Sequence, residues 1–142
     1  MKKYLITCLV FTSFWVIGAD QPQVVVNITN IKQLKGNIRV AFYKKGSAFP
    51  REGSITYAKE VKVSKLGEMS LSFIDIPFGE YAIAVFQDKN QNQKIDKNFV
   101  GYPTEPFGFS KNFKPKFSEP DFSDCNVVIS SNNNSFTIKL ID

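Results

Sequence analysis

The chain has 142 residues, a formal net charge of +5, two cysteines and no histidine. The lack of histidine removes the commonest general base and the usual zinc ligand, which disfavours most hydrolytic and zinc-dependent activities. The positive charge is too small for the strongly basic face that nucleic-acid binding requires, so no nucleic-acid partner is expected.

The first nineteen residues have the organisation of a secretory signal peptide. Lys2 and Lys3 give a positive start, residues 4–17 are almost entirely apolar, and Gly18 and Ala19 are the small residues of a cleavage site. The apolar run is shorter than the stretch of about 20 residues that crosses a bilayer. We therefore predict cleavage after Ala19, a single domain over residues 20–142 without a transmembrane segment, and a periplasmic or secreted location.

Cleavage would change the inventory of reactive groups. The loss of Lys2 and Lys3 lowers the net charge from +5 to +3, and the mature chain keeps one cysteine, Cys125. A single cysteine cannot form an intramolecular disulfide, although the predicted compartment would permit one.

Apolar residues alternate with polar ones along the mature chain, as they do in half-buried antiparallel strands. The alternation predicts six such strands around residues 24–28, 38–42, 61–63, 69–73, 125–129 and 136–140. Residues 81–86 are apolar on both faces, which predicts a central strand beneath covering elements. About seven strands without helical periodicity predict an all-β domain, an antiparallel two-sheet sandwich of the immunoglobulin-like kind.

Residues 99–124 show no sustained period and contain four of the seven prolines, which indicates a long functional loop or a missed element. Within it, lysines are interleaved with four phenylalanines: Phe107, Phe109, Phe113 and Phe117. We expect the phenylalanines to anchor the segment on the sandwich while the lysines remain in water. The alternative is a surface that stacks on sugars or bases and neutralises anions.

The residues after the predicted central strand carry oxygen ligands at alternate positions, in the order of an EF-hand calcium loop. The matching positions 1, 3, 5, 7 and 9 are held by Asp88, Asn90, Asn92, Lys94 and Asp96. Lys94 would contribute only its backbone carbonyl. Calcium is a hard cation that binds side-chain and backbone oxygens gathered round one point, so these residues are a candidate calcium site.

Two positions depart from that loop. Gln93 stands at position 6, where the loop needs glycine, and Phe99 stands at position 12, where a bidentate glutamate closes the shell. The missing carboxylate would come from Glu105, or from Asp121 or Asp124. The alternative interpretation is an Asx-rich turn whose side chains bond to their own backbone.

Three segments together resemble one bacterial family. They are residues 76–82 (Ile-Pro-Phe-Gly-Glu-Tyr-Ala), the pattern from Asp88 to Asp96, and residues 101–110 (Gly-Tyr-Pro-Thr-Glu-Pro-Phe-Gly-Phe-Ser). They resemble the exported family catalogued as domain of unknown function 2141, over about residues 24–140. The resemblance implies an exported β-sandwich similar to transthyretin-like or carboxypeptidase-regulatory modules, with no established activity. The family often has histidine where this chain has Gln87, and glycine where it has Gln93.

These observations predict an exported accessory binding or structural module of the cell envelope, stabilised by calcium at residues 88–96, and not an enzyme. Its expected partner is another protein or an envelope glycan, and no cofactor besides calcium is expected. The alternative is a hydrolase acting on envelope polysaccharide through two carboxylates.

Overall fold

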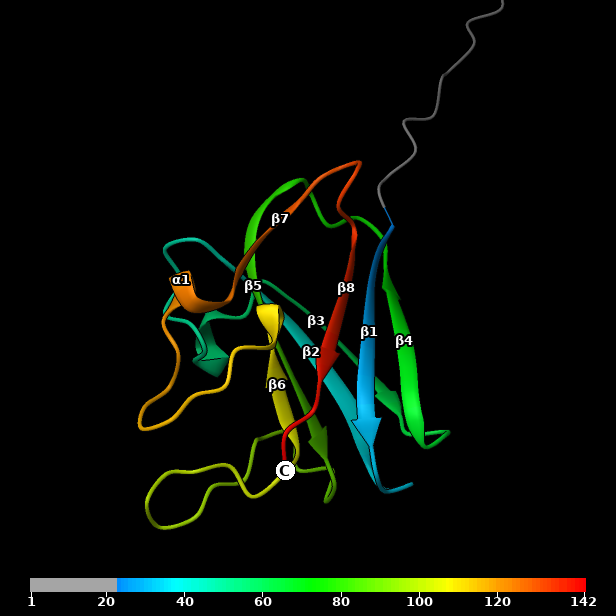
Figure 1. The fold of residues 1–142 in the computed structure, drawn as a ribbon, viewed down its shortest axis with the longest axis vertical. Coiled ribbons are helices and arrows are strands. Elements are labelled where there is room, and N and C mark those ends of the chain that lie inside the picture. Colours follow the sequence, from blue (N-terminus) through cyan, green and yellow to red (C-terminus); the bar gives the residue numbers. More distant parts are fainter. Residues whose placement is uncertain (1–22) are drawn as a thin grey trace, which may run out of the picture.

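The computed structural model describes residues 23–142, so the predicted signal peptide lies outside the described residues. Two sheets pack face to face (Figure 1). The smaller sheet has the order β4-β1-β8, with β1 at Val24–Ile31, β4 at Gly67–Phe73 and β8 at Ser135–Lys139. The larger sheet has the order β3-β2-β5-β6, and β7 also pairs with β5. Its strands are β2 at Asn37–Lys44, β3 at Tyr57–Lys62, β5 at Gly79–Asp88, β6 at Phe107–Phe109 and β7 at Asn126–Ile129. The predicted all-β two-sheet sandwich is confirmed.

The core lies between the two sheets and is formed by the alternating apolar positions of the predicted strands. Phe42 is central to it, and its ring contacts those of Phe73 and Tyr81 edge-on, with centroids 4.9 and 6.2 Å apart. The fully buried aliphatic residues around these rings are Val24, Val26, Ile28, Ile38, Val40, Ile83 and Ile138. Each comes from one face of its strand, which is why the two-residue period located the strands.

One pairing differs from the purely antiparallel arrangement that the sequence predicts. β1 pairs antiparallel with β4 but parallel with β8, whose partners run from Val25 with Ser135 to Thr29 with Lys139. Alternation reveals which face of a strand is buried but not the direction of its neighbour, so the sequence could not reveal this pairing.

The region from residue 99 to 124 contains short elements that the sequence did not reveal. They are β6, a 3₁₀ turn at Ser110–Asn112 (η2), and α1, a single helical turn at Phe122–Cys125. A further 3₁₀ turn, η1, lies at Glu52–Ser54. Cys125, which the sequence placed in a strand, ends α1 and is fully buried. Among residues 23–142, no helix is long and apolar enough to cross a membrane.

β5 is the central strand of the larger sheet, as predicted, because β2 lies on one side of it and both β6 and β7 on the other. β6 pairs with residues 84–86 and β7 with residues 79–82, which leaves Ile83 between them. Ser110 fills the gap: its buried hydroxyl accepts the N–H of Ile83 at 2.9 Å and donates to the carbonyl of Cys125. One serine therefore joins two short strands along the same edge of β5.

The two sheets are in close contact where β6 meets residues 138–141. Gly108 has no room for a side chain, since a Cβ there would lie 2.8 Å from Ile138 Cγ2 and from the carbonyl oxygen of Lys139. On either side of this contact, Phe107 and Ile141 exchange two backbone hydrogen bonds of 2.9 and 2.7 Å. These contacts close one corner of the sandwich.

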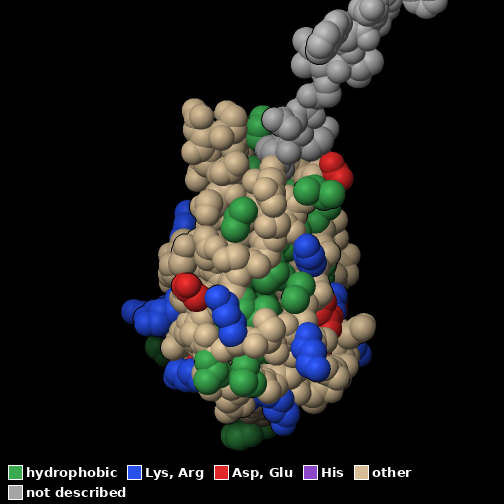
Figure 2. Space-filling view, turned by 90° about the vertical axis from the view of Figure 1, so that its right-hand side faces the viewer, with side chains coloured by type: hydrophobic (Ala, Val, Ile, Leu, Met, Phe, Trp, Pro, Cys, Tyr) green, Lys and Arg blue, Asp and Glu red, His purple; other side chains and the backbone are tan. Residues whose placement is uncertain are grey.

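The two outer faces differ in character. The smaller sheet exposes polar side chains, such as Ser70, whose hydroxyl donates to Asn27 at 2.6 Å. On the side of the molecule that carries β4, basic side chains are spread among small apolar groups and form no single patch (Figure 2). The larger sheet also carries apolar side chains on its outer face, among them Ala41, Ala84 and Phe86, with Arg39 opposite Phe86. Loops cover this second face, and they build the sites described next.

Candidate functional site

Asp88 ends β5 at the first residue of the predicted calcium loop and is fully buried. Its carboxylate accepts two backbone hydrogen bonds from the loop, from the N–H of Asn92 at 3.2 Å and from that of Gln93 at 2.7 Å. Gly36 packs against the same point, with φ of +67° and no room for a Cβ, which would lie 1.9 Å from the Asp88 carbonyl oxygen. Asp88 is therefore fixed where the strand gives way to the loop.

The next predicted ligands converge on Asp96. The side-chain NH₂ groups of Asn90 and Asn92 donate to its carboxylate at 2.6 and 2.9 Å. The amide oxygens of the same residues accept the backbone N–H groups of Asn92 and Lys94 at 3.2 and 2.9 Å. The loop is thus an Asx-rich turn in which Asp88, Asn90 and Asn92 accept backbone N–H groups two to five residues away.

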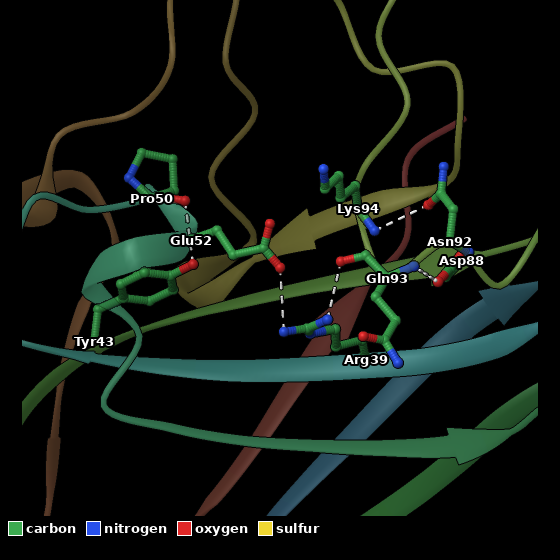
Figure 3. A network of polar contacts seen from close by, with 8 residues as sticks. All are labelled: Arg39, Tyr43, Pro50, Glu52, Asp88, Asn92, Gln93 and Lys94. Atoms are coloured by element: carbon green, nitrogen blue, oxygen red, sulfur yellow. Dashed lines mark hydrogen bonds and ion pairs between the residues drawn. The ribbon is translucent and has the colours of Figure 1, made fainter.

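Gln93 does not prevent the sharp turn that glycine makes in an EF-hand loop. It adopts the left-handed conformation, with φ of 64°, at a cost of about 1–2 kcal/mol for a residue with a side chain. Its carbonyl accepts a hydrogen bond of 2.9 Å from Arg39, whose guanidinium also contacts Glu52 at 3.2 Å (Figure 3). Arg39 rises from the outer face of β2 and ties the loop to the sheet.

Glu105 folds back onto the loop, as the sequence suggested for the missing carboxylate. It is 4% exposed, and its two carboxylate oxygens accept the N–H of Lys89 at 2.8 Å and that of Asp96 at 3.1 Å. Asp121 and Asp124, the other two candidates, lie at the start of α1, where the Asp124 carboxylate accepts the N–H of Asp121 at 2.9 Å. Of the three candidates, the structure brings Glu105 to the loop.

The residue types fit calcium, but their hydrogen bonds already form a complete turn. In the part of the chain that the structure describes, no three His, Cys, Asp or Glu side chains gather in a group that could hold a metal. A calcium ion would depend on the carboxylates of Asp88 and Asp96, the Lys94 carbonyl and two amide oxygens. The NH₂ groups of Asn90 and Asn92 now face Asp96, so both amides would have to turn. The calcium site therefore stays a prediction.

An apolar cleft of about 380 Å³ lies over the outer face of the larger sheet. Its floor consists of outward-facing side chains of β2, β5 and β6, among them Ala41, Ala84, Phe86 and Phe109. Its walls come from three segments, residues 50–55, 95–103 and 115–120. The second wall is the continuation of the 88–96 loop, so the Asx-rich turn determines where that wall begins.

The polar groups of the cleft are few, and most are paired with each other. Arg39 contacts Glu52, and Lys97 forms an ion pair of 2.7 Å with Glu119 that links two of the walls. The hydroxyl of Tyr43 donates to the Pro50 carbonyl at 3.1 Å. Burial, aided by the nearby Glu52 carboxylate, raises the pKa of Tyr43 to about 12, so this hydroxyl remains a neutral donor.

The amino-acid pattern did not locate this cleft, although one signal in it pointed there. The strand that is apolar on both faces, β5, required a cover on its outer side, and the loops around the cleft supply that cover. The expected anchoring by four phenylalanines holds in part: Phe107 is buried, and Phe109 and Phe113 are half-buried. It is wrong for Phe117, which is 100% exposed on a segment, residues 114–120, that pairs with no strand.

Fold and site together define a small two-sheet β module with a loop-walled cleft on one sheet. The chain belongs to the family described as uncharacterized protein conserved in bacteria, DUF2141, whose model matches residues 26–137. No curated protein and no solved structure matches the chain.

Proposed function

We propose that this protein is an exported accessory module of the bacterial cell envelope that binds a partner in the cleft and catalyses no reaction. The observation that carries the proposal is the cleft itself, with an apolar floor on a rigid sheet and walls made of loops. Binding residues commonly lie on loops held by a rigid scaffold, and ligand pockets commonly enclose about 300–1,000 Å³. The signal-like residues 1–19 support a periplasmic or secreted location.

The lining of the cleft favours a protein over an envelope glycan as the partner. A glycan presents many hydroxyl groups, each of which loses its hydrogen bonds to water unless the site replaces them. Here Arg39 and Lys97 are already paired with Glu52 and Glu119. Apolar side chains of a protein would instead contact the apolar floor around Ala84 and gain from leaving water.

Calcium enters the proposal as a stabiliser of one wall. Asp88 and Asp96 bracket the turn from which residues 95–103 continue into the cleft, and Glu105 holds both ends of the turn by its backbone. A cation bound between the carboxylates would reduce the mobility of this wall. Weak affinity, with a dissociation constant of about 0.1–1 mM, is the range typical of extracellular calcium modules.

The test fills the cleft without touching the core. Ala84→Phe places a ring in the cleft, and Thr137→Phe places the same ring on the exposed outer face of β8 as a control. Each protein is used to capture partners from envelope extract, with calcium and with chelator. We expect one partner to be retained by the wild-type and Thr137→Phe proteins and lost with Ala84→Phe. Equal retention by all three proteins would refute the cleft as the binding site.

A carboxylate-dependent hydrolase acting on envelope polysaccharide is the second candidate, and one observation favours it. Glu52 and Glu119 line the same cleft from different walls. Each is engaged by a cation, which argues for a structural role instead. Release of reducing sugar from purified envelope polysaccharide, abolished by both Glu52→Gln and Glu119→Gln, would establish the hydrolase and overturn the proposed binding role.

A further inference from the structure

Two loop tips carry the most exposed aromatic residues of the described chain. Phe99 and Phe117 are both 100% exposed, and Val100 beside Phe99 is 69% exposed. We define the two tips as residues 94–100 and 113–120. Single exposed apolar residues are normal on a soluble protein, but fully exposed phenylalanines on neighbouring loops mark a surface that contacts something apolar.

The two tips belong to one surface. Val100 and Phe117 line the same cleft from opposite walls, and the 2.7 Å ion pair between Lys97 and Glu119 joins the tips directly. In Figure 1 both loops project from the larger sheet on the side away from β1 and β4. Both tips therefore project on the same side of the molecule.

The tips are also basic. Within the tips, the four exposed lysines outnumber the acidic residues Asp96 and Glu119, while Asp121 and Asp124 border the second tip; the lysines are Lys94, Lys97, Lys114 and Lys116. One of these acids is taken up by the ion pair within the tips. The surface thus combines protruding aromatic rings with an excess of ammonium groups.

We infer that the two tips dock the protein on an anionic lipid surface. Phenylalanine rings enter the boundary between headgroups and acyl chains, and lysines meet the lipid phosphates, so apolar burial and electrostatic attraction act together. A second copy of this chain is a poor occupant because two basic surfaces repel each other. The inference rests on the proposed export, but not on a partner in the cleft.

The experiment measures binding of the chain without residues 1–19 to lipid vesicles by flotation. Every strand in the described part of the chain begins at or after Val24, so this removal leaves all of those strands in place. One set of vesicles contains phosphatidylglycerol and phosphatidylcholine, and the other only phosphatidylcholine. We expect binding to the anionic vesicles that weakens as salt is raised, and much weaker binding to the neutral ones.

Matched variants assign the binding to the tips. Phe99→Ala and Phe117→Ala should each weaken it about tenfold or more, while Ile74→Ala, at a residue 71% exposed on another part of the molecule, should leave it unchanged. Replacing Lys114 and Lys116 by glutamine should weaken binding to the anionic vesicles roughly fivefold per lysine. The control for the change in net charge is the exposed pair Lys62 and Lys65. Replacing this pair by glutamine should weaken vesicle binding less.

Three outcomes would overturn the inference. The first is failure of the wild-type chain to float with anionic vesicles, and the second is unchanged flotation of the Phe99→Ala/Phe117→Ala double variant. The third is a wild-type dimer in sedimentation that Phe117→Ala dissociates, since the tips would then meet another copy of the chain. Ala84→Phe should float like the wild type, so failure of the cleft proposal and failure of lipid docking are separable.

Discussion

Ser110 shows how one side chain can complete a sheet. β6 and β7 both stop short at Ile83, and the Ser110 hydroxyl occupies the gap with one hydrogen bond accepted and another donated. Ser110→Ala leaves a buried N–H and a buried carbonyl without these partners. We expect the free energy of unfolding to fall by about 1–3 kcal/mol in denaturant titration.

The control for this change is Ser118→Ala on an exposed loop, which should shift the free energy of unfolding by less than about 0.5 kcal/mol. Equal stability of the two variants would mean that water replaces the Ser110 hydroxyl at no cost.

Cys125 gives the fold a dependence on alkaline pH. Burial, with a smaller contribution from the Asp124 charge, raises the pKa of its thiol from 9.0 to about 12. The folded-state pKa lies above the unfolded-state value. The contribution of the neutral thiol to the free energy of unfolding is therefore fully present below about pH 9 and is lost as the pH rises toward 12. We therefore expect native Cys125 to resist a thiol reagent at pH 8, and Cys125→Ala to lose less stability than the wild type between pH 9 and 10.

Tyr43, whose pKa is also raised to about 12 but from 10.0, supplies the comparison within the same molecule. The contribution of Tyr43 to the free energy of unfolding should decline only above about pH 10. The pH at which the decline begins therefore distinguishes the two groups. Rapid labelling of the thiol in the folded wild type would contradict the burial of Cys125.

At the scale of elements, the 88–96 turn is where calcium can be tested directly. If the loop binds calcium, the ion binds the folded state and raises the melting temperature. At about ten times the dissociation constant the stabilisation is about 1.4 kcal/mol, which corresponds to several degrees for a domain of this size. Asp96→Asn removes a charge from the turn, so it should abolish the shift. The exposed Asp75→Asn should leave the shift intact.

Melting curves in chelator and in about 5 mM calcium are the measurement, with magnesium expected to have a smaller effect because it demands tighter octahedral geometry. Glu105→Ala should also reduce the shift if its carboxylate moves from the backbone N–H groups to the ion. Identical wild-type curves in chelator and calcium would establish that the loop is an Asx turn alone.

The long strands could be predicted from sequence because their buried residues recur at every second position, as Val24, Val26 and Ile28 do. β6 could not, because Phe107–Phe109 is three residues long with glycine at its centre, which locally resembles a turn. The same limit applies to the site. Spacing alone brought Asp88, Asn90, Asn92 and Asp96 together, whereas the cleft depends on how distant loops pack over β5.

At the scale of the whole molecule, the first prediction concerns export. Lys2, Lys3 and the apolar run predict that the native host removes residues 1–19 and leaves Asp20 as the first residue. Intact mass measurement of the protein from periplasm and medium checks this. Full-length protein confined to the cytoplasm would contradict the export, the localisation and the lipid docking together.

The parallel pairing of β1 with β8 has a consequence for how the chain is made. The smaller sheet joins strands about 110 residues apart, as in the hydrogen bond from Asn30 to the Leu140 carbonyl. β1 therefore lacks one of its two neighbours until residues 135–139 have been synthesised, and contacts of such long range form slowly. During that interval the smaller sheet has only two of its three strands, so the nascent chain cannot yet reach its folded state.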